Sequence, residues 1–112
     1  MTIAEFYNAM HRELVGDMSY YTPIICLDGF AMSVQASSKH YSHPREDGLK
    51  VYTHYEVGFP SEQPTYFADY ADQPDYTNTV YPWVPVELIV AEINYHGGTM
   101  DQRSENIFEE EL

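Results

Sequence analysis

The hydrophobic and polar positions alternate in patterns that divide the chain into short segments. The first segment carries a stripe at the spacing of one helical face, made of Ile3, Phe6, Met10 and Leu14. Thr2-Ile3-Ala4-Glu5 is a capping box, in which the Thr2 and Glu5 side chains bond each other's backbone N–H groups. We therefore predict an amphipathic helix over residues 3–15 that ends at Gly16 and docks on the core.

A β-hairpin is predicted next, with residues 17–23 as the connection that leads into it. The apolar run Ile24–Leu27 precedes Asp28-Gly29, a dipeptide suited to a two-residue turn whose central positions both need positive φ. Residues 30–36 then alternate between apolar and polar side chains. The pattern predicts two strands with one buried face.

The middle of the chain predicts a long loop followed by a third strand. Residues 37–50 have turn-forming composition and no hydrophobic period. Residues 51–59 alternate again, with Val51, Thr53, Tyr55 and Val57 on one face. We expect this strand to pair antiparallel with the second.

Two further helices are predicted in the second half. Ser61 is a candidate N-cap for a short helix over residues 62–72, with Phe67, Tyr66, Tyr70 and Ala71 facing inward, and an irregular aromatic loop is the alternative. Pro74 ends this element, and residues 75–85 are extended or looped. Pro85 then opens a helix that closes at residues 96–98 with Gly97 in the C′ position. Its apolar stripe is Val86, Ile89, Val90 and Ile93.

This order of elements predicts an α+β fold. We expect a small antiparallel sheet of about three strands, with an N-terminal helix and two further helices packed on one face. The 112 residues fit one domain, which we place at residues 1–103. Residues 104–112, which end in Glu109, Glu110, Glu111 and Leu112, are predicted to be an acidic tail.

The net charge of the chain indicates which classes of partner it can bind. Eighteen acidic residues against five Lys and Arg give a formal charge of −13, and no Lys or Arg lies between Lys50 and Arg103. Such a chain is not expected to bind nucleic acid or an anionic membrane directly, so a charged partner should be basic. The alternative is that the acidity serves only solubility.

The same sequence indicates a cytoplasmic protein. No apolar run approaches the roughly 20 residues of a membrane helix, and an acid stands near the N-terminus where a signal peptide carries basic residues. Cys26 is the single cysteine and lies in an apolar run, which predicts a buried structural thiol and fits a reducing compartment.

The sequence offers little for catalysis. His40 and His43 are the one pair with metal-ligand spacing, and His54, His96 or Glu56 could complete a site, although a solvated loop explains the pair as well. Cys26 has no histidine near it in sequence, and neither common phosphate-binding loop occurs. We therefore predict a protein that is not an enzyme and needs no cofactor or metal.

Residues 66–83, YFADYADQPDYTNTVYPW, combine acids and aromatics without a cation. Carboxylates at such intervals can imitate the phosphates of a nucleic-acid strand, and tyrosines can stack on arginine guanidinium groups. We expect at least half of Phe67, Tyr70, Tyr81 and Trp83 to belong to the core. The predicted partner-binding residues are Glu56, Glu62, Asp69, Asp72 and Asp75 as charge mimics, with Tyr70 and Tyr76 as anchors.

In its short length, strong acidity, single cysteine and acid-and-tyrosine segment, the chain resembles small phage-encoded inhibitors of host defence, such as DNA-mimic anti-restriction and anti-CRISPR proteins. The resemblance is one of overall character and rests on no shared motif. It implies a stoichiometric inhibitor that blocks the nucleic-acid-binding surface of a host nuclease complex. Two alternatives remain: a structural or adaptor protein that forms a homodimer through Trp83 or Tyr81, and a small metalloprotein that uses His40 and His43.

Overall fold

The computed structural model describes residues 1–10, 12–15 and 18–100 of the chain. Two α-helices, six strands and one 3₁₀ turn follow one another within these ranges. They are α1 (Ile3–Ala9), β1 (Arg12–Val15), β2 (Met18–Tyr21), β3 (Ile24–Ile25), β4 (Ala31–Gln35), β5 (His54–Gly58), the 3₁₀ turn η1 (Ala68–Tyr70), β6 (Val80–Pro85) and α2 (Val86–Tyr95).

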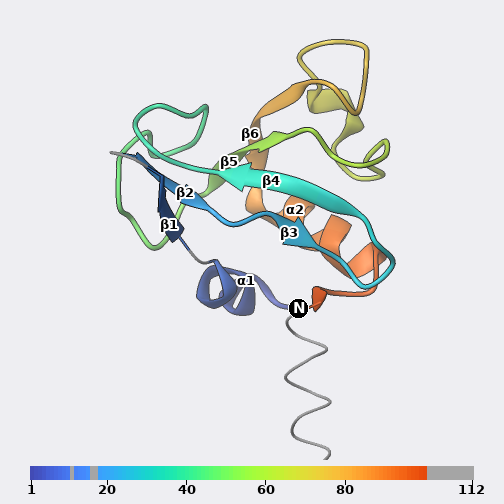
Figure 1. Ribbon diagram of the computed structural model, residues 1–112, viewed down its shortest axis with the longest axis horizontal. Coiled ribbons are helices and arrows are strands. Elements are labelled where there is room, and N and C mark those ends of the chain that lie inside the picture. Colours follow the sequence, from blue (N-terminus) through green and yellow to red (C-terminus); the bar gives the residue numbers. More distant parts are fainter. Residues whose placement is uncertain (11, 16–17, 101–112) are drawn as a thin grey trace, which may run out of the picture.

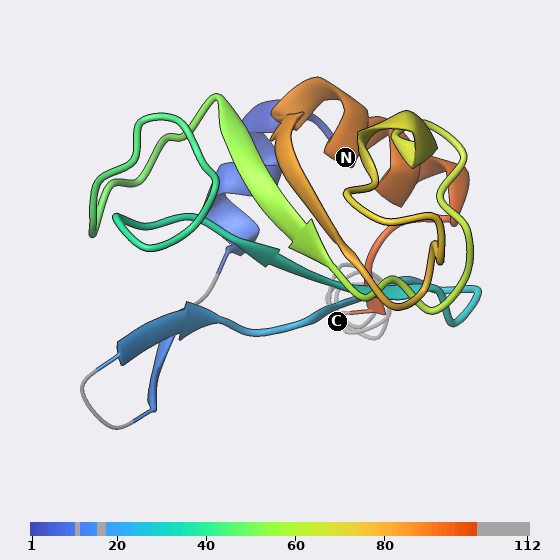
Figure 2. The same cartoon turned by 90° about the horizontal axis from the view of Figure 1, so that it is seen from above.

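The main sheet has four antiparallel strands in the order β3-β4-β5-β6, and β1 and β2 form a separate hairpin. Figures 1 and 2 show α2 against one face of this sheet, with α1 beside it and the β1–β2 hairpin projecting away. The α+β prediction is confirmed, although the described part of the chain has four strands in its main sheet and two α-helices, rather than three and three. No described helix is long and apolar enough to cross a membrane.

The first helix begins where the capping box predicts. The backbone N–H of Glu5 donates to Thr2 Oγ1 at 3.1 Å, and the N–H of Thr2 donates to Glu5 Oε1 at 2.9 Å. The predicted end is wrong, because the helix stops at Ala9 and Met10 is extended. Residues 12–15 instead form β1, since they pair antiparallel with β2 in a register that sets Val15 opposite Met18. The predicted stop at Gly16 lies outside the described residues.

The predicted β3–β4 hairpin is confirmed, with a different turn. The N–H of Cys26 donates to the Phe30 carbonyl at 2.8 Å, and the N–H of Gly29 donates to the Cys26 carbonyl at 3.0 Å. This bonding closes a loop over residues 27–29 in which Gly29 has a φ of +94°. The loop therefore needs one left-handed residue at Gly29, rather than the two that a two-residue turn requires.

Of the strand predicted over residues 51–59, residues 54–58 form β5, which pairs antiparallel with β4, as predicted, and also with β6 across a β-bulge. Tyr55 pairs with Val84 and Val57 pairs with Tyr81, so Pro82 and Trp83 together face one residue of β5. The extra residue, with Trp83 at a φ of +50°, turns the Trp83 side chain outward and returns Val84 to the core. Residues 37–50 carry neither helix nor strand, in agreement with the predicted loop.

The last helix follows the sequence closely. Its predicted stripe is buried, and Gly97 at a φ of +91° occupies the C′ position. The N–H groups of Gly98 and Gly97 donate to the carbonyls of Ile93 and Asn94 at 3.0 and 3.1 Å, a Schellman motif. The chain then turns back, and the Gly98 carbonyl accepts from the N–H of Leu27 at 3.0 Å. This contact brings the end of α2 to the β3–β4 turn.

The core lies between the sheet and the two helices. Phe6 of α1 meets Tyr55 of β5 edge to face, with ring centroids 5.5 Å apart. Cys26 is fully buried, as predicted, and burial raises the pKa of its thiol to about 11. The other fully buried large side chains include Tyr52, Phe67, Tyr81, Ile89 and Ile93.

Candidate functional site

The acid-rich segment forms one loop between β5 and β6, residues 59–79, called the acidic loop below. The N–H of Phe59 donates to the Thr79 carbonyl at 3.0 Å and closes its base. The prediction of a helix over residues 62–72 is wrong, because only the 3₁₀ turn of residues 68–70 forms there. The alternative of an irregular aromatic loop is the one observed.

A buried acid explains why this segment is not helical. Glu92 of α2 is fully buried, and its Oε1 accepts from the N–H groups of Thr65 at 2.8 Å and Tyr66 at 2.7 Å. In a helix these N–H groups would bond to carbonyls four residues earlier in the chain. The Glu92 side chain therefore takes the place of helical bonds and ties the acidic loop to α2.

Three more contacts hold the outer part of the loop. Phe67 is buried and meets the Tyr81 ring edge to face, with centroids 5.3 Å apart. The Tyr81 hydroxyl donates to the Tyr76 carbonyl at 2.5 Å, and the N–H of Asp72 donates to the Val80 carbonyl at 3.0 Å. Burial, with the neighbouring Tyr76 and Asp75, raises the pKa of Tyr81 to about 12. The loop has no regular structure beyond η1, but it is anchored at several points.

Six of the seven predicted partner-binding residues lie on this loop and are exposed: Glu62, Asp69, Tyr70, Asp72, Asp75 and Tyr76. Among the described residues, none of the three aspartates forms an ion pair. The expectation that Tyr66 and Tyr70 face inward is wrong, since they are 46% and 37% exposed. Phe67, by contrast, is fully buried beneath the loop.

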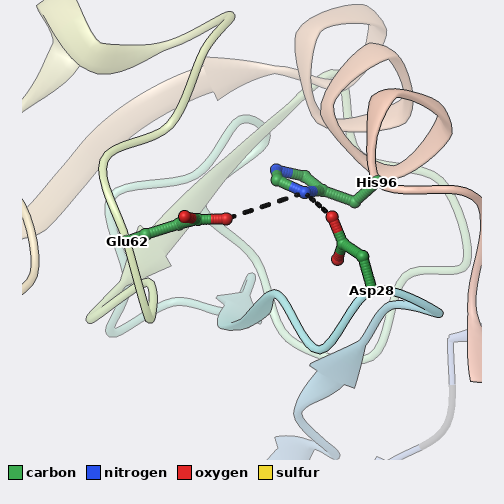
Figure 3. Close-up of side chains that lie close together, drawn as sticks. All are labelled: Asp28, Glu62 and His96. Atoms are coloured by element: carbon green, nitrogen blue, oxygen red, sulfur yellow. Dashed lines mark hydrogen bonds and ion pairs between the residues drawn. The ribbon is translucent and has the colours of Figure 1, made fainter.

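Glu56 lies outside the acidic loop, and Glu62 lies in the first part of the loop, before the other predicted acids. Glu56 is on β5, and its Oε1 accepts from the N–H of Tyr41 at 3.2 Å. Glu62 is near the base of the acidic loop and points toward His96, as Figure 3 shows. Glu56 therefore belongs to a different element from the other four predicted acids.

The His96 side chain is the centre of a polar cluster made by three segments of the chain. Its Nδ1 donates to Asp28 Oδ2 at 2.6 Å and lies 3.9 Å from Glu62 Oε1 (Figure 3). Its Nε2 donates to Glu92 Oε2 at 2.9 Å. The imidazole stacks on Phe30 with ring centroids 4.0 Å apart and an interplanar angle of 3°. Both ring nitrogens and one ring face are thus fixed in position.

The electrostatics of this cluster favour a charged imidazole. Burial by itself would lower the pKa of His96, but the hydrogen bonds to Asp28 and Glu92 and the charges of these carboxyl groups outweigh it and raise the pKa. The pKa of Asp28 is lowered, first by the bond from the Phe30 N–H and then by the bond from His96. The cluster joins the β3–β4 turn, the acidic loop and the end of α2.

His40 and His43 do not take part in this cluster. His40 Nδ1 lies 2.6 Å from Ser37 Oγ, whereas the His43 ring packs against the His54 ring with centroids 6.1 Å apart. Within the described residues, the one group of three potential metal ligands with converging donor atoms consists of Asp28, Glu62 and His96. Among the described residues, no third potential ligand therefore converges with His40 and His43, as a metal site formed by this pair would need.

A cavity of about 570 Å³ lies between α1 and β3, and none of Asp28, Glu62 and His96 lines it. Apolar side chains such as Phe6, Ile24 and Met100 line much of it. Its one acidic side chain, Glu5, is already engaged in the capping box of α1. Among the described residues, the lining of the cavity therefore includes no pair of acidic and basic side chains.

Searches of protein-family models, curated proteins and solved structures find no match for this chain. Any functional assignment therefore depends on the residues and geometry described above.

Proposed function

We propose that the protein is a non-enzymatic binding protein whose acidic loop docks on the basic, nucleic-acid-binding surface of a partner protein and blocks it. The observation that carries this proposal is the gathering of three exposed aspartates and two exposed tyrosines on one anchored loop without an internal cation. These residues are Asp69, Asp72, Asp75, Tyr70 and Tyr76.

The anchoring of the loop supports this function energetically. Binding by a mobile segment costs conformational entropy, and a loop that is already held in place avoids part of that cost. Glu92, Phe67 and Tyr81 hold the acidic loop from beneath, so its outer side chains are presented on a supported backbone. The proposed contact surface is consequently preorganised.

The charge distribution supports a basic partner. The exposed aspartates lie within residues 51–102, a stretch without Lys or Arg, in a chain of formal charge −13. Mutual repulsion among these carboxylates does not stabilise the isolated fold. Arginine or lysine side chains of a partner would relieve this repulsion. Exposed tyrosines add contact area at low entropic cost and stack on guanidinium groups.

The test is a comparison of three immobilised baits in a cell lysate at low salt. The first is the wild-type chain, and the second is the variant Asp69→Asn/Asp72→Asn/Asp75→Asn. The third changes the acids at positions 109, 110 and 111 to Gln, which alters the net charge equally at another place in the sequence. We expect the wild type and the third bait to capture the same nucleic-acid-binding protein, which rising salt releases and the second bait fails to retain.

Equal capture by all three baits would contradict the proposal, because the loop aspartates would then have no specific role. Equal loss from the second and third baits would also contradict it, since total charge rather than the loop would govern binding. Salt-dependent elution alone is insufficient, because any highly acidic chain attracts basic proteins.

Self-association is a second candidate function, and a separate surface favours it. Tyr41 and Trp83 pack against each other with ring centroids 5.0 Å apart, although they are 41% and 47% exposed. Tyr81, the other residue considered for a dimer contact, is fully buried and cannot serve. A salt-insensitive dimer in sedimentation velocity that Trp83→Asn abolishes would support this function, because Asn tolerates the positive φ at this position. A wild-type monomer at all concentrations would exclude it.

A further inference from the structure

We propose that Asp28, Glu62 and His96 form a binding site for a divalent transition-metal cation, with Zn²⁺ as its closest chemical match. The three residues come from the β3–β4 turn, the acidic loop and the C-terminal cap of α2 (Figure 3). One donor atom from each lies within 4.8 Å of the other two. This inference is independent of the proposed docking function.

The orientation of His96 is the first argument for a metal site. Its Nε2 is bonded to the buried Glu92, so its Nδ1 is the nitrogen that faces the exposed carboxylates of Asp28 and Glu62. A histidine that binds a metal through one nitrogen commonly donates the other N–H to a carboxylate, which fixes the ring and strengthens the ligand. Glu92 is placed to perform this orienting role.

The ring is also held in a position that exposes one donor atom to the site. It stacks on Phe30 at 4.0 Å, and the edge contact with Tyr95 has ring centroids 5.1 Å apart at 90°. Glu92 is itself fixed by the two N–H groups of Thr65 and Tyr66. Preorganisation of this kind reduces the ordering cost of binding a cation.

The distances require only small movements. Tetrahedral zinc with ligand bonds of about 2.0–2.1 Å needs its donor atoms about 3.3 Å apart. The distance from His96 Nδ1 to Asp28 Oδ2, which is 2.6 Å, must therefore increase. The distance from His96 Nδ1 to Glu62 Oε1, which is 3.9 Å, must decrease. The carboxylates can make these movements, because their side chains are 49% and 62% exposed.

The local charge gives the third argument. Three carboxyl groups surround one imidazole, and the Glu62–His96 distance of 3.9 Å is too long for a hydrogen bond. A cation that replaces the proton on Nδ1 would bind His96, Asp28 and Glu62 together and offset the excess negative charge. One imidazole nitrogen with two carboxylate oxygens suits Zn²⁺, whereas Mg²⁺ and Ca²⁺ prefer oxygen ligands.

The test begins with protein stripped by a chelator and then titrated with zinc chloride by calorimetry. We expect saturable binding of one Zn²⁺ per chain. Glu62→Gln and Asp28→Asn should each weaken it at least tenfold. The matched control is Glu87→Gln, which removes an exposed carboxylate from the same helix as Glu92 and should leave the affinity unchanged. Magnesium chloride at the same concentrations should give no comparable binding.

Nitrogen-15 NMR of the histidine rings locates the metal independently of affinity. We expect Zn²⁺ to shift the Nδ1 resonance of His96, while its Nε2 remains protonated by its bond to Glu92. The absence of saturable binding would overturn the proposal, as would equal weakening by Glu62→Gln and Glu87→Gln. Zinc-induced shifts on His40 or His43 without one on His96 would also overturn it.

Discussion

At the residue scale, Glu92 links the core to both candidate sites. It is fully buried and accepts from Thr65, Tyr66 and His96. Glu92→Ala leaves these donors without their acceptor, so we expect it to lower the free energy of unfolding by about 3 kcal/mol. Urea denaturation measures the effect, and Glu87→Ala, an exposed change on the same helix, should stay within about 0.5 kcal/mol of wild type. Equal effects of the two changes would show that Glu92 is not an anchor.

Cys26 gives a second prediction at this scale. With a thiol pKa of about 11, roughly one molecule in a thousand carries the thiolate near pH 8, and full burial also restricts access. Native protein should therefore react with iodoacetamide far more slowly than protein in concentrated guanidinium. Mass spectrometry follows the reaction. Comparable rates in the two conditions would contradict the packing described for this residue.

At the scale of elements, α1 depends on its capping box. The helix spans seven residues, too few to be stable alone in water, and it packs into the core through Phe6. Thr2→Ala removes the side-chain acceptor for the Glu5 N–H and should cost about 1 kcal/mol of stability. Thr2→Ser keeps the hydroxyl and should recover most of the loss in thermal or urea unfolding. A serine variant as unstable as the alanine variant would argue against the capping role.

Local sequence signals account for the elements that were predicted correctly. The capping box, the β3–β4 hairpin and the stripe of α2 each depend on neighbouring residues. The error at residues 12–15 arose because Leu14 continues the helical stripe of Ile3, Phe6 and Met10, so the pattern favoured a helix as far as Gly16. The error at residues 62–72 has a non-local cause, since the bonds from Thr65 and Tyr66 to Glu92 join positions more than 25 residues apart.

At the scale of the whole molecule, one candidate site is made by residues that are close in sequence and the other by residues that are far apart. The residues from Asp69 to Tyr76 are close in sequence, so one loop presents them together, and the sequence could predict that group. Glu62 was assigned to the same surface, yet it turns toward His96. The i, i+4 spacing of Glu92 and His96 on a predicted helix was the one local signal of the His96 cluster. Asp28 lies far from His96 in the sequence, and the two residues meet only because the fold brings the β3–β4 turn to the end of α2.

The most direct test of the central claim is a competition experiment with the purified partner captured by the loop. A fluorescently labelled nucleic-acid fragment is bound to that partner, and its anisotropy is followed as this protein is added. The account predicts that wild-type protein displaces the fragment, and that the variant Asp69→Asn/Asp72→Asn/Asp75→Asn displaces it at least tenfold less effectively. A ternary complex in which the partner holds both the fragment and this protein would contradict the account.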